Sequence, residues 1–280
     1  MYSGFNLSLT NTNDYQNYSS NFMEQIECNK TSIQNSLTDY TKNGILDGSM
    51  IQKDWFPQVK ADIFISHSHN DFDLAKGFAC WLYETFGLTS FIDSCVWDYS
   101  NNLLRIIDDE YCTNPRNPYV YNYDNRNFST SHVHMMLQTA LYKMIDKTES
   151  FILLNTSNSI LTMPSVKNTI TNETFSPWIY SEIIASQVMR RKQLSDYRFY
   201  PVLEHREFSE INNSLNIKYD IDLSHLIDIN SHDLDVWKSR YNTSASASPH
   251  LLNSSTVYQK HPLDFLYKLV EGREKNEQSA

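Results

Sequence analysis

The sequence predicts an α/β fold, an open and doubly wound sheet of about five parallel strands with helices on both faces. Two observations support this fold class: short apolar segments bounded by polar residues, and helical patterns between them. Because strands alternate with helices, neighbouring strands are expected to pair in parallel through right-handed crossovers. The expected strands are ADIFIS (61–66), SFID (90–93), SFILLN (150–155), FYPVL (199–203) and HLIDI (225–229).

Apolar residues at spacings of three and four predict the connecting helices. One helix follows the first strand over 74–85, and Gly87 provides its C-terminal stop. Another runs through 136–145, directly before the third strand. A further helix opens at 176–177, where serine is a good N-cap and proline suits the first helical position. The last helix covers about 262–272.

Three stretches lie outside this alternation. The polar N-terminal part has weak helical spacing and is expected to form a helical extension packed on the main domain, with an oligomerisation arm as the alternative. An Asn- and aromatic-rich insertion contains a short helix near 102–111 and otherwise a long loop, and a second surface loop is expected at 239–260. The expected organisation is a 1–58 extension, a 59–272 domain with the insertion 94–131, and a polar tail 273–280.

Charge and composition narrow the function classes. The 280 residues carry a net charge of −10, and no basic stripe is present, so a nucleic-acid partner is not expected. No segment is apolar enough to cross a bilayer. The four cysteines form no CxxC pair and the N-terminus lacks the pattern of a signal peptide, so a reducing, cytoplasmic setting is expected.

Ligands of open α/β sheets bind at the carboxyl ends of the strands. The side chains expected there follow the first three strands, in 66–71, 93–98 and 155–159. Trp178 and Glu182 are four residues apart and therefore share one helix face, where an aromatic plane beside a carboxylate would suit a flat base and sugar hydroxyls. The alternative is structural, with Trp178 in the core and Glu182 on a solvated helix surface.

A metal site is a competing interpretation of the segment after the first strand. His67, His69 and Asp71 form an HxHxD string, which resembles the metal motif of metallo-β-lactamase-type hydrolases. The further histidine of that motif is replaced by Phe72, and those hydrolases have a different sheet architecture. No metal is therefore expected, and neither a phosphate-binding glycine loop nor a GxSxG elbow occurs.

Taken in order, the segments resemble a TIR (Toll/interleukin-1 receptor-like) domain over about 58–272. The resemblance rests on four segments: ADIFISHSHND (61–71), GLTSFIDS (87–94), MLQTALYKMIDKTESFILLNTS (136–157) and SPWIYSEI (176–183). It implies a flavodoxin-like doubly wound sheet. It also implies one of two functions, cleavage of NAD+ at the nicotinamide–ribose bond or non-catalytic assembly through TIR–TIR contacts.

The enzymatic branch of the family, which includes bacterial antiphage-defence NADases, supplies the expected function. The family's catalytic glutamate corresponds to Glu182, which would stabilise an oxocarbenium-like ribose as neutral nicotinamide departs. The product would be an ADP-ribose-type signal, linear or cyclic, for a downstream effector, with NAD+ as substrate and no other cofactor. The expected substrate-binding residues are Trp178, Ser66, His67, Ser68, His69, Asp93 and Trp97.

The insertion 94–131 departs from the family, whose loop after the second strand is much shorter. That loop usually helps to form a composite site between neighbouring TIR domains. The insertion is therefore expected to cap the pocket or to contact a neighbouring chain, and its tyrosines and asparagines supply amphipathic contact surface.

Overall fold

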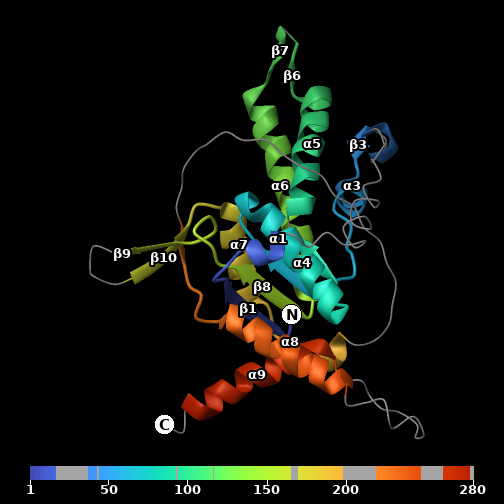
Figure 1. Ribbon diagram of the computed structural model, residues 1–280. Coiled ribbons are helices and arrows are strands. Elements are labelled where there is room, and N and C mark those ends of the chain that lie inside the picture. Colours follow the sequence, from blue (N-terminus) through green and yellow to red (C-terminus); the bar gives the residue numbers. More distant parts are fainter. Residues whose placement is uncertain are drawn as a thin grey trace, which may run out of the picture.

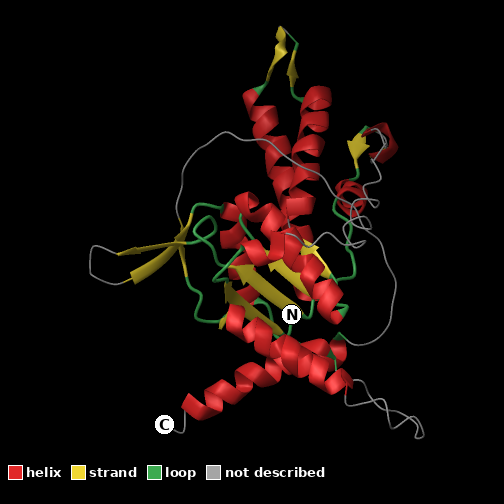
Figure 2. Cartoon of the chain, in the orientation of Figure 1, coloured by secondary structure: helices red, strands yellow, loops and turns green. Residues whose placement is uncertain are grey.

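The computed structural model describes residues 1–16, 37–42, 44–92, 94–115, 117–164, 170–197, 219–246 and 261–277. A five-stranded, all-parallel sheet lies at its centre, with helices on both faces (Figures 1 and 2). This arrangement confirms the predicted α/β class. The strands, in sheet order, are β12 (Ile227–Asn230), β1 (Ser3–Ser8), β8 (Ser150–Leu154), β4 (Ile63–Ser66) and β5 (Ser90–Ile92).

Four of these strands were expected from their apolar segments, and the fifth was not. The expected strand 199–203 lies outside the described residues. Strand β1 pairs with β8 on one side and with β12 on the other. Doubly wound sheets of the flavodoxin-like kind have the strand order 2-1-3-4-5. The present sheet has the same arrangement, with β5, β4, β8, β1 and β12 at these five positions. The position of the fourth strand is thus occupied by β1, which comes first in the chain.

The expectation of an entirely helical N-terminal extension is therefore wrong for residues 3–8. Phe5 and Leu7 are fully buried on one face of the sheet, while Asn6 points to the other face. This period-two pattern is that of a strand, but a single pair of apolar residues in a polar context is a weak signal. The rest of the described extension contains α1 (Asn13–Gln16), η1 (Leu37–Tyr40), β2 (Thr41–Lys42), β3 (Ile45–Leu46) and α3 (Gly48–Trp55).

Two hydrophobic layers enclose the sheet. One layer packs α4, α8, α9 and α1 against inward-facing residues such as Phe5, Ile65 and Ile152. At the contact between α1 and α4, a Cβ on Gly77 would collide with the carbonyl oxygen of Tyr15, so only glycine fits there. The helices of this layer are α4 (Phe72–Phe86), α8 (Ser231–Ser246) and α9 (Pro262–Glu277).

The other layer packs α3, α5, α6 and α7 against Phe64, Phe151 and Leu153. Two terminal signals of the sequence are confirmed: Gly87 ends α4 with a positive φ of 70°, and Ser176 caps α7 by accepting a hydrogen bond from the Ile179 amide. The long helices of this layer are α5 (Ser94–Tyr111), α6 (Tyr123–Lys147) and α7 (Pro177–Val188).

The insertion 94–131 is mostly helical, which corrects the expectation of a long loop. Helices α5 and α6 pair and extend away from the sheet, and the hairpin β6 (Thr113–Asn114)–β7 (Asn117–Tyr121) lies at their far end (Figure 1). A buried Asp108 joins the two helices by accepting hydrogen bonds from the Ser129 hydroxyl (2.5 Å) and the Arg126 Nε (3.2 Å). This contact acts as a polar clamp between α5 and α6.

Three further elements complete the described chain. A small antiparallel sheet has the order β11 (Tyr219–Ile221)–β10 (Ile170–Thr174)–β9 (Leu161–Pro164). Short 3-10 turns occur at η2 (His69–Asp71) and η3 (Leu194–Asp196). The expected loop at 239–260 is wrong for its first part, because α8 continues to Ser246, and 247–260 lie outside the described residues.

Candidate functional site

The structure joins the end of β4 to the middle of α7. Ser66, the last residue of β4, donates a hydrogen bond from its hydroxyl to Oε2 of Glu182 over 2.7 Å. Both residues are completely buried. Two segments that lie 116 residues apart in the sequence therefore meet at the carboxyl end of a central strand. The alternative that Glu182 is a solvated surface residue is wrong.

Burial gives this carboxylate an unusual environment. A carboxylate that loses water requires hydrogen-bond donors in exchange, and the Ser66 hydroxyl supplies one. In a low-dielectric surrounding, a fixed negative charge acts more strongly on a nearby positive charge than it would in water. The same burial means that, in the described conformation, Glu182 has no solvent-exposed surface.

The three residues after Ser66 differ in exposure. His67 is buried, with its Nδ1 3.4 Å from the carbonyl oxygen of Ile65, and its ring stacks on Phe72 at 6.2 Å. Ser68 is half-buried, and His69 is exposed at the start of η2. The expected site residues of this segment are thus divided between the interior and the surface.

Asp71 connects the segment after β4 to the segment after β8. It is 8% exposed, and its two oxygens accept hydrogen bonds from the Thr156 hydroxyl (2.5 Å) and from Asn158 Nδ2 (2.7 Å). The expected groups 66–71 and 155–159 are therefore brought together as neighbouring turns. Through these two hydrogen bonds the Asp71 carboxylate joins the turn after β4 to the turn after β8.

Hydrogen bonds continue from these turns to the start of α7. The Ser159 carbonyl accepts a hydrogen bond from the Thr174 hydroxyl (2.9 Å), and the Thr174 hydroxyl accepts one from the Ser176 amide (3.2 Å). Ser176 is the N-cap of α7. The position of the helix that carries Glu182 is therefore tied, through a short series of hydroxyl groups, to the turns at the carboxyl ends of β4 and β8.

Trp178 lies one turn before Glu182 and is half-buried. Its ring packs edge-to-face against His134 of α6, with centroids 5.5 Å apart, and it also borders the hydrophobic layer. Burial lowers the pKa of His134 below its ordinary value of 6.5, so this ring is mainly neutral near pH 7. Trp178 therefore contacts the core on one side and remains partly exposed.

Two expected site residues cannot be placed in the site. Asp93 lies outside the described residues. Trp97 belongs to the first turn of α5, directly after β5, and its side chain lies outside the described part of the structure.

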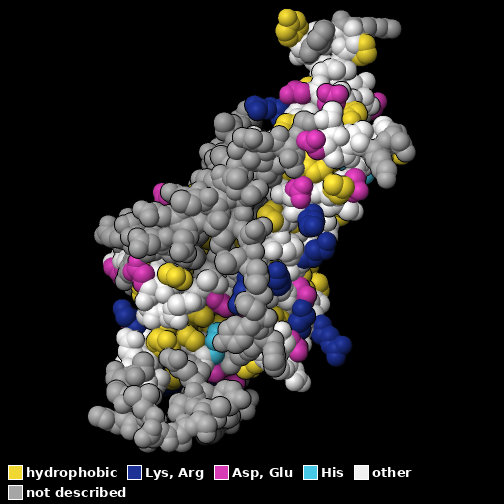
Figure 3. Space-filling view, turned by 90° about the vertical axis from the view of Figure 1, so that its right-hand side faces the viewer, with side chains coloured by type: hydrophobic (Ala, Val, Ile, Leu, Met, Phe, Trp, Pro, Cys, Tyr) yellow, Lys and Arg dark blue, Asp and Glu magenta, His cyan; other side chains and the backbone are white. Residues whose placement is uncertain are grey.

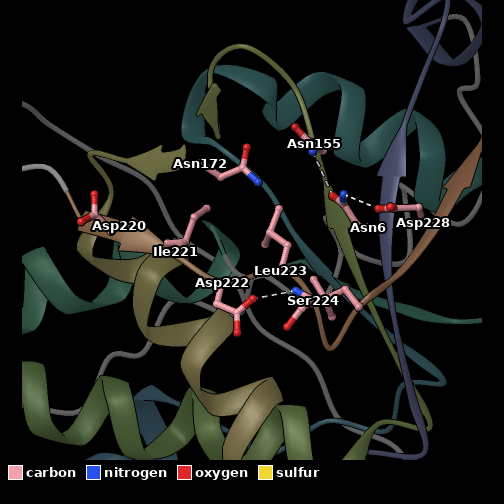
Figure 4. A pocket seen from close by; sticks show the side chains of 10 residues that line it. Asn6, Asn155, Asn172, Asp220, Ile221, Asp222, Leu223, Ser224 and Asp228 are labelled. Atoms are coloured by element: carbon pink, nitrogen blue, oxygen red, sulfur yellow. Dashed lines mark hydrogen bonds between the residues drawn. The ribbon is translucent and has the colours of Figure 1, made fainter. Parts of the chain in front are cut away.

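A separate, open pocket of about 520 Å³ lies between the central sheet and the β9–β10–β11 sheet (Figure 4). Pockets of this size commonly hold small molecules. None of its lining residues was named from the sequence as a site residue except Asn155. The described lining consists of Asn6, Asn155, Asn172, Asp220, Ile221, Asp222, Leu223, Ser224, Leu226 and Asp228.

Three of these residues form a row across adjacent strands. Asn6 Nδ2 donates to Oδ1 of Asp228 (2.8 Å), and Asn155 Nδ2 donates to Oδ1 of Asn6 (3.0 Å), as Figure 4 shows. Strand pairing explains the row, because Asn6 is in register with both Asp228 and Leu153, and Asn155 lies two residues beyond Leu153. The alternation in SGFNLS was the sequence signal that could have identified Asn6.

The loop that forms the other wall is fastened to α7. His225 Nε2 lies 2.8 Å from the Ser186 hydroxyl, which itself donates to the Ile183 carbonyl, so Nε2 carries the proton of the neutral ring. The pKa of His225 is lowered, mainly because the ring is partly buried. The pKa of Asp222 is lowered, mainly because its carboxylate accepts a hydrogen bond from the backbone amide of Ser224. Asp222 also accepts a hydrogen bond from the side chain of Gln187 on α7.

Metal-binding side chains do not cluster within the described ranges. Nowhere among these residues do three or more His, Cys, Asp or Glu side chains converge as metal ligands would. Similarly, within the same ranges no helix has the length and apolar character needed to cross a membrane.

Comparison with known proteins adds no relative to this description. No protein-family model, no curated protein and no solved structure matches the chain.

Proposed function

We propose that this chain cleaves NAD+ at the nicotinamide–ribose bond, with Glu182 as the carboxylate that stabilises the reacting ribose. The observation that carries the proposal is the 2.7 Å hydrogen bond between Ser66 and Glu182. It joins two of the segments that resemble TIR domains, at the edge of a parallel sheet where ligands generally bind. The resemblance supplies the reaction and the geometry supports the residue.

The chemistry requires a fixed negative charge near C1 of the ribose. As nicotinamide departs with its bonding electrons it becomes neutral and needs no proton, while positive charge develops on the sugar. A preorganised carboxylate stabilises that charge without having to reorient. Ser66 would act as a positioning residue, because its hydroxyl fixes one oxygen of Glu182.

Substrate access is part of the proposal. Glu182 has an exposed fraction of 0%, so NAD+ reaches it only after α7 moves relative to the end of β4. The hydroxyl series from Asp71 to Ser176 would have to rearrange during this movement. The enzyme would accordingly be latent until a trigger, such as self-association through TIR–TIR contacts, opens the site.

The direct experiment is incubation of the purified chain with NAD+, with nicotinamide and ADP-ribose species followed by chromatography. We expect nicotinamide release by the wild-type chain and faster release by Thr156→Val. This substitution removes one hydrogen bond to Asp71 and so weakens the contacts that hold α7 against the end of β4. No nicotinamide from either protein, over a range of chain concentrations, would contradict the proposal.

A non-catalytic interaction module is the second candidate, and two observations favour it. Glu182 is enclosed, and several large apolar side chains are exposed on the projecting helices and their hairpin, including Tyr119 (97%), Tyr123 (77%) and Phe128 (70%). Figure 3 shows hydrophobic side chains along this projection, interspersed with acidic ones. If assembly is the whole function, substitution of Tyr119 and Tyr123 by serine would abolish self-association while Glu182→Gln would leave it unchanged.

The biological setting follows from the proposed reaction. An ADP-ribose-type or cyclic product would act as a signal for a downstream effector, in the cytoplasm and in antiviral defence. No cofactor is needed beyond NAD+ as substrate.

A further inference from the structure

We propose that the pocket lined by Asn6, Asn155 and Asp228 binds a neutral, monosaccharide-sized polyol. This inference is independent of Glu182, which is not among the described residues that line the pocket. It concerns a second ligand site, formed by the β12–β1–β8 part of the sheet and by the loop that leads from β11 to β12.

The row of polar side chains has a defined direction. A carboxylate only accepts hydrogen bonds, so Asp228 requires that Asn6 present its nitrogen, and the Asn6 oxygen then faces the nitrogen of Asn155. The side chain of Asn6 is 8% exposed, and its hydrogen bonds to Asp228 and Asn155 hold it in one orientation. Strand pairing keeps the three side chains on one face of the sheet.

This row leaves hydrogen-bonding capacity of both kinds. Each carboxamide nitrogen carries two hydrogens, of which Asn6 and Asn155 use one each within the row, and the second oxygen of Asp228 remains an acceptor. Hydroxyl groups both donate and accept, so neighbouring hydroxyls of a polyol match alternating amide and carboxylate groups. Ammonium groups only donate and could not accept from the two amides.

Apolar residues complete the match. Ile221 and Leu226 are at least nine-tenths buried, and Leu223 is half-buried, so the pocket also offers aliphatic surface. The C–H faces of a sugar ring can pack on such surface while its hydroxyls reach the row. The volume of about 520 Å³ leaves room for a monosaccharide with some water.

Charge excludes phosphorylated ligands. Asp220, Asp222 and Asp228 line the pocket, and the part of its lining that the structure describes contains no Lys, Arg or His. Like charges repel, and these exposed carboxylates would weaken the binding of a phosphate group while leaving a neutral ligand unaffected. The acidic groups therefore select a neutral sugar over its phosphate ester.

The test compares D-glucose, glucose 6-phosphate and spermidine by NMR titration of the full chain, with the amide signals of 220–228 as the readout. We expect D-glucose to bind with a millimolar Kd and glucose 6-phosphate to bind at least about tenfold more weakly. Binding of spermidine without binding of glucose would overturn the assignment in favour of a cation site. No signal change with any of these compounds at about 50 mM would overturn the site itself.

Two variants test the row, with a third as control. Asn155→Leu removes hydrogen bonds without touching the Asn6–Asp228 contact and should weaken glucose binding about tenfold. Asp228→Asn keeps an oxygen for Asn6 but removes a charge, so it should narrow the difference between glucose and glucose 6-phosphate. Asp235→Asn, on the exposed surface of α8, should change neither the affinity for glucose nor the preference for glucose over glucose 6-phosphate. Equal glucose affinity in all three variants would refute the role of the row.

Discussion

Truncation of Phe5 to alanine tests the place of the N-terminal strand in the sheet. Phe5 is fully buried in the hydrophobic layer between the central sheet and α9. Its ring stacks on that of Tyr267 in α9, with centroids 6.2 Å apart. If residues 3–8 form a strand between β8 and β12, the truncation leaves a cavity in the core.

The magnitude follows from that burial. Loss of a buried phenylalanine side chain typically lowers the free energy of unfolding by about 3–5 kcal/mol. For a chain of this size, 1 kcal/mol corresponds to about 2–4 °C in Tm, so Phe5→Ala should lower Tm by about 6–20 °C. Tyr119→Ala is the matched aromatic control, because Tyr119 is 97% exposed and its loss should cost at most about 0.5 kcal/mol.

The assay is thermal unfolding followed by circular dichroism and by tryptophan fluorescence. The two probes should report the same midpoint for each protein. A Phe5→Ala variant whose Tm stays within about 2 °C of the wild type, comparable with that of Tyr119→Ala, would refute the position of β1.

Three further predictions concern stability and metal dependence. Asp108→Asn should lower the free energy of unfolding by about 2 kcal/mol, because it removes the charge of the clamp between α5 and α6 and replaces one of its two acceptor oxygens by an amino group. Glu110→Gln, on the exposed side of α5, should have little effect, and denaturant titration measures both. The folded-state pKa of His225 lies below its ordinary value of 6.5, so as the pH falls the unfolded chain takes up a proton on this ring before the folded chain does. The stability of the fold should therefore decrease as the pH drops below about 6.5. The fall should be smaller in His225→Gln, and equal pH profiles of Tm would contradict this assignment. A chelator should change neither folding nor nicotinamide release, and loss of both together with stoichiometric metal would support the hydrolase alternative.

The four apolar strand segments β4, β5, β8 and β12 were predictable because each is short, rich in large apolar residues and bounded by polar ones. Strand β1 was not, because only Phe5 and Leu7 face the core, and the glycine, asparagine and serine beside them resemble a loop. Tertiary pairing with two neighbouring strands stabilises a segment whose own propensity is weak.

The helical insertion escaped prediction for a related reason. The first half of α6 packs on α5 rather than on the sheet, so its sequence lacks a broad apolar stripe. Its start is fixed instead by the Asn122 cap and by the clamp at Asp108. Such contacts between specific polar side chains do not produce a periodic pattern in the sequence.

The sequence predicted the proximity of Ser66 and Glu182 but not their burial. Both residues were expected at the carboxyl end of the first strand in the apolar series, and the topology brings them there. The sequence interpretation took Trp178 and Glu182 as one accessible face. Enclosure depends on how α7 packs against α6 and the small sheet, which requires contacts between distant segments.

The central claim is tested most directly by the rate of nicotinamide release from NAD+ by Glu182→Gln and by Glu84→Gln. Glutamine can still accept the Ser66 hydrogen bond, so the fold should persist while the negative charge is lost. Glu84 lies exposed on α4, which covers the opposite face of the sheet, and it controls for loss of one carboxylate. We predict that the rate falls by about 10²–10³ in Glu182→Gln and is unchanged in Glu84→Gln, with Tm within about 2 °C of the wild type in both. A folded Glu182→Gln variant that releases nicotinamide at the wild-type rate would contradict the assignment of Glu182.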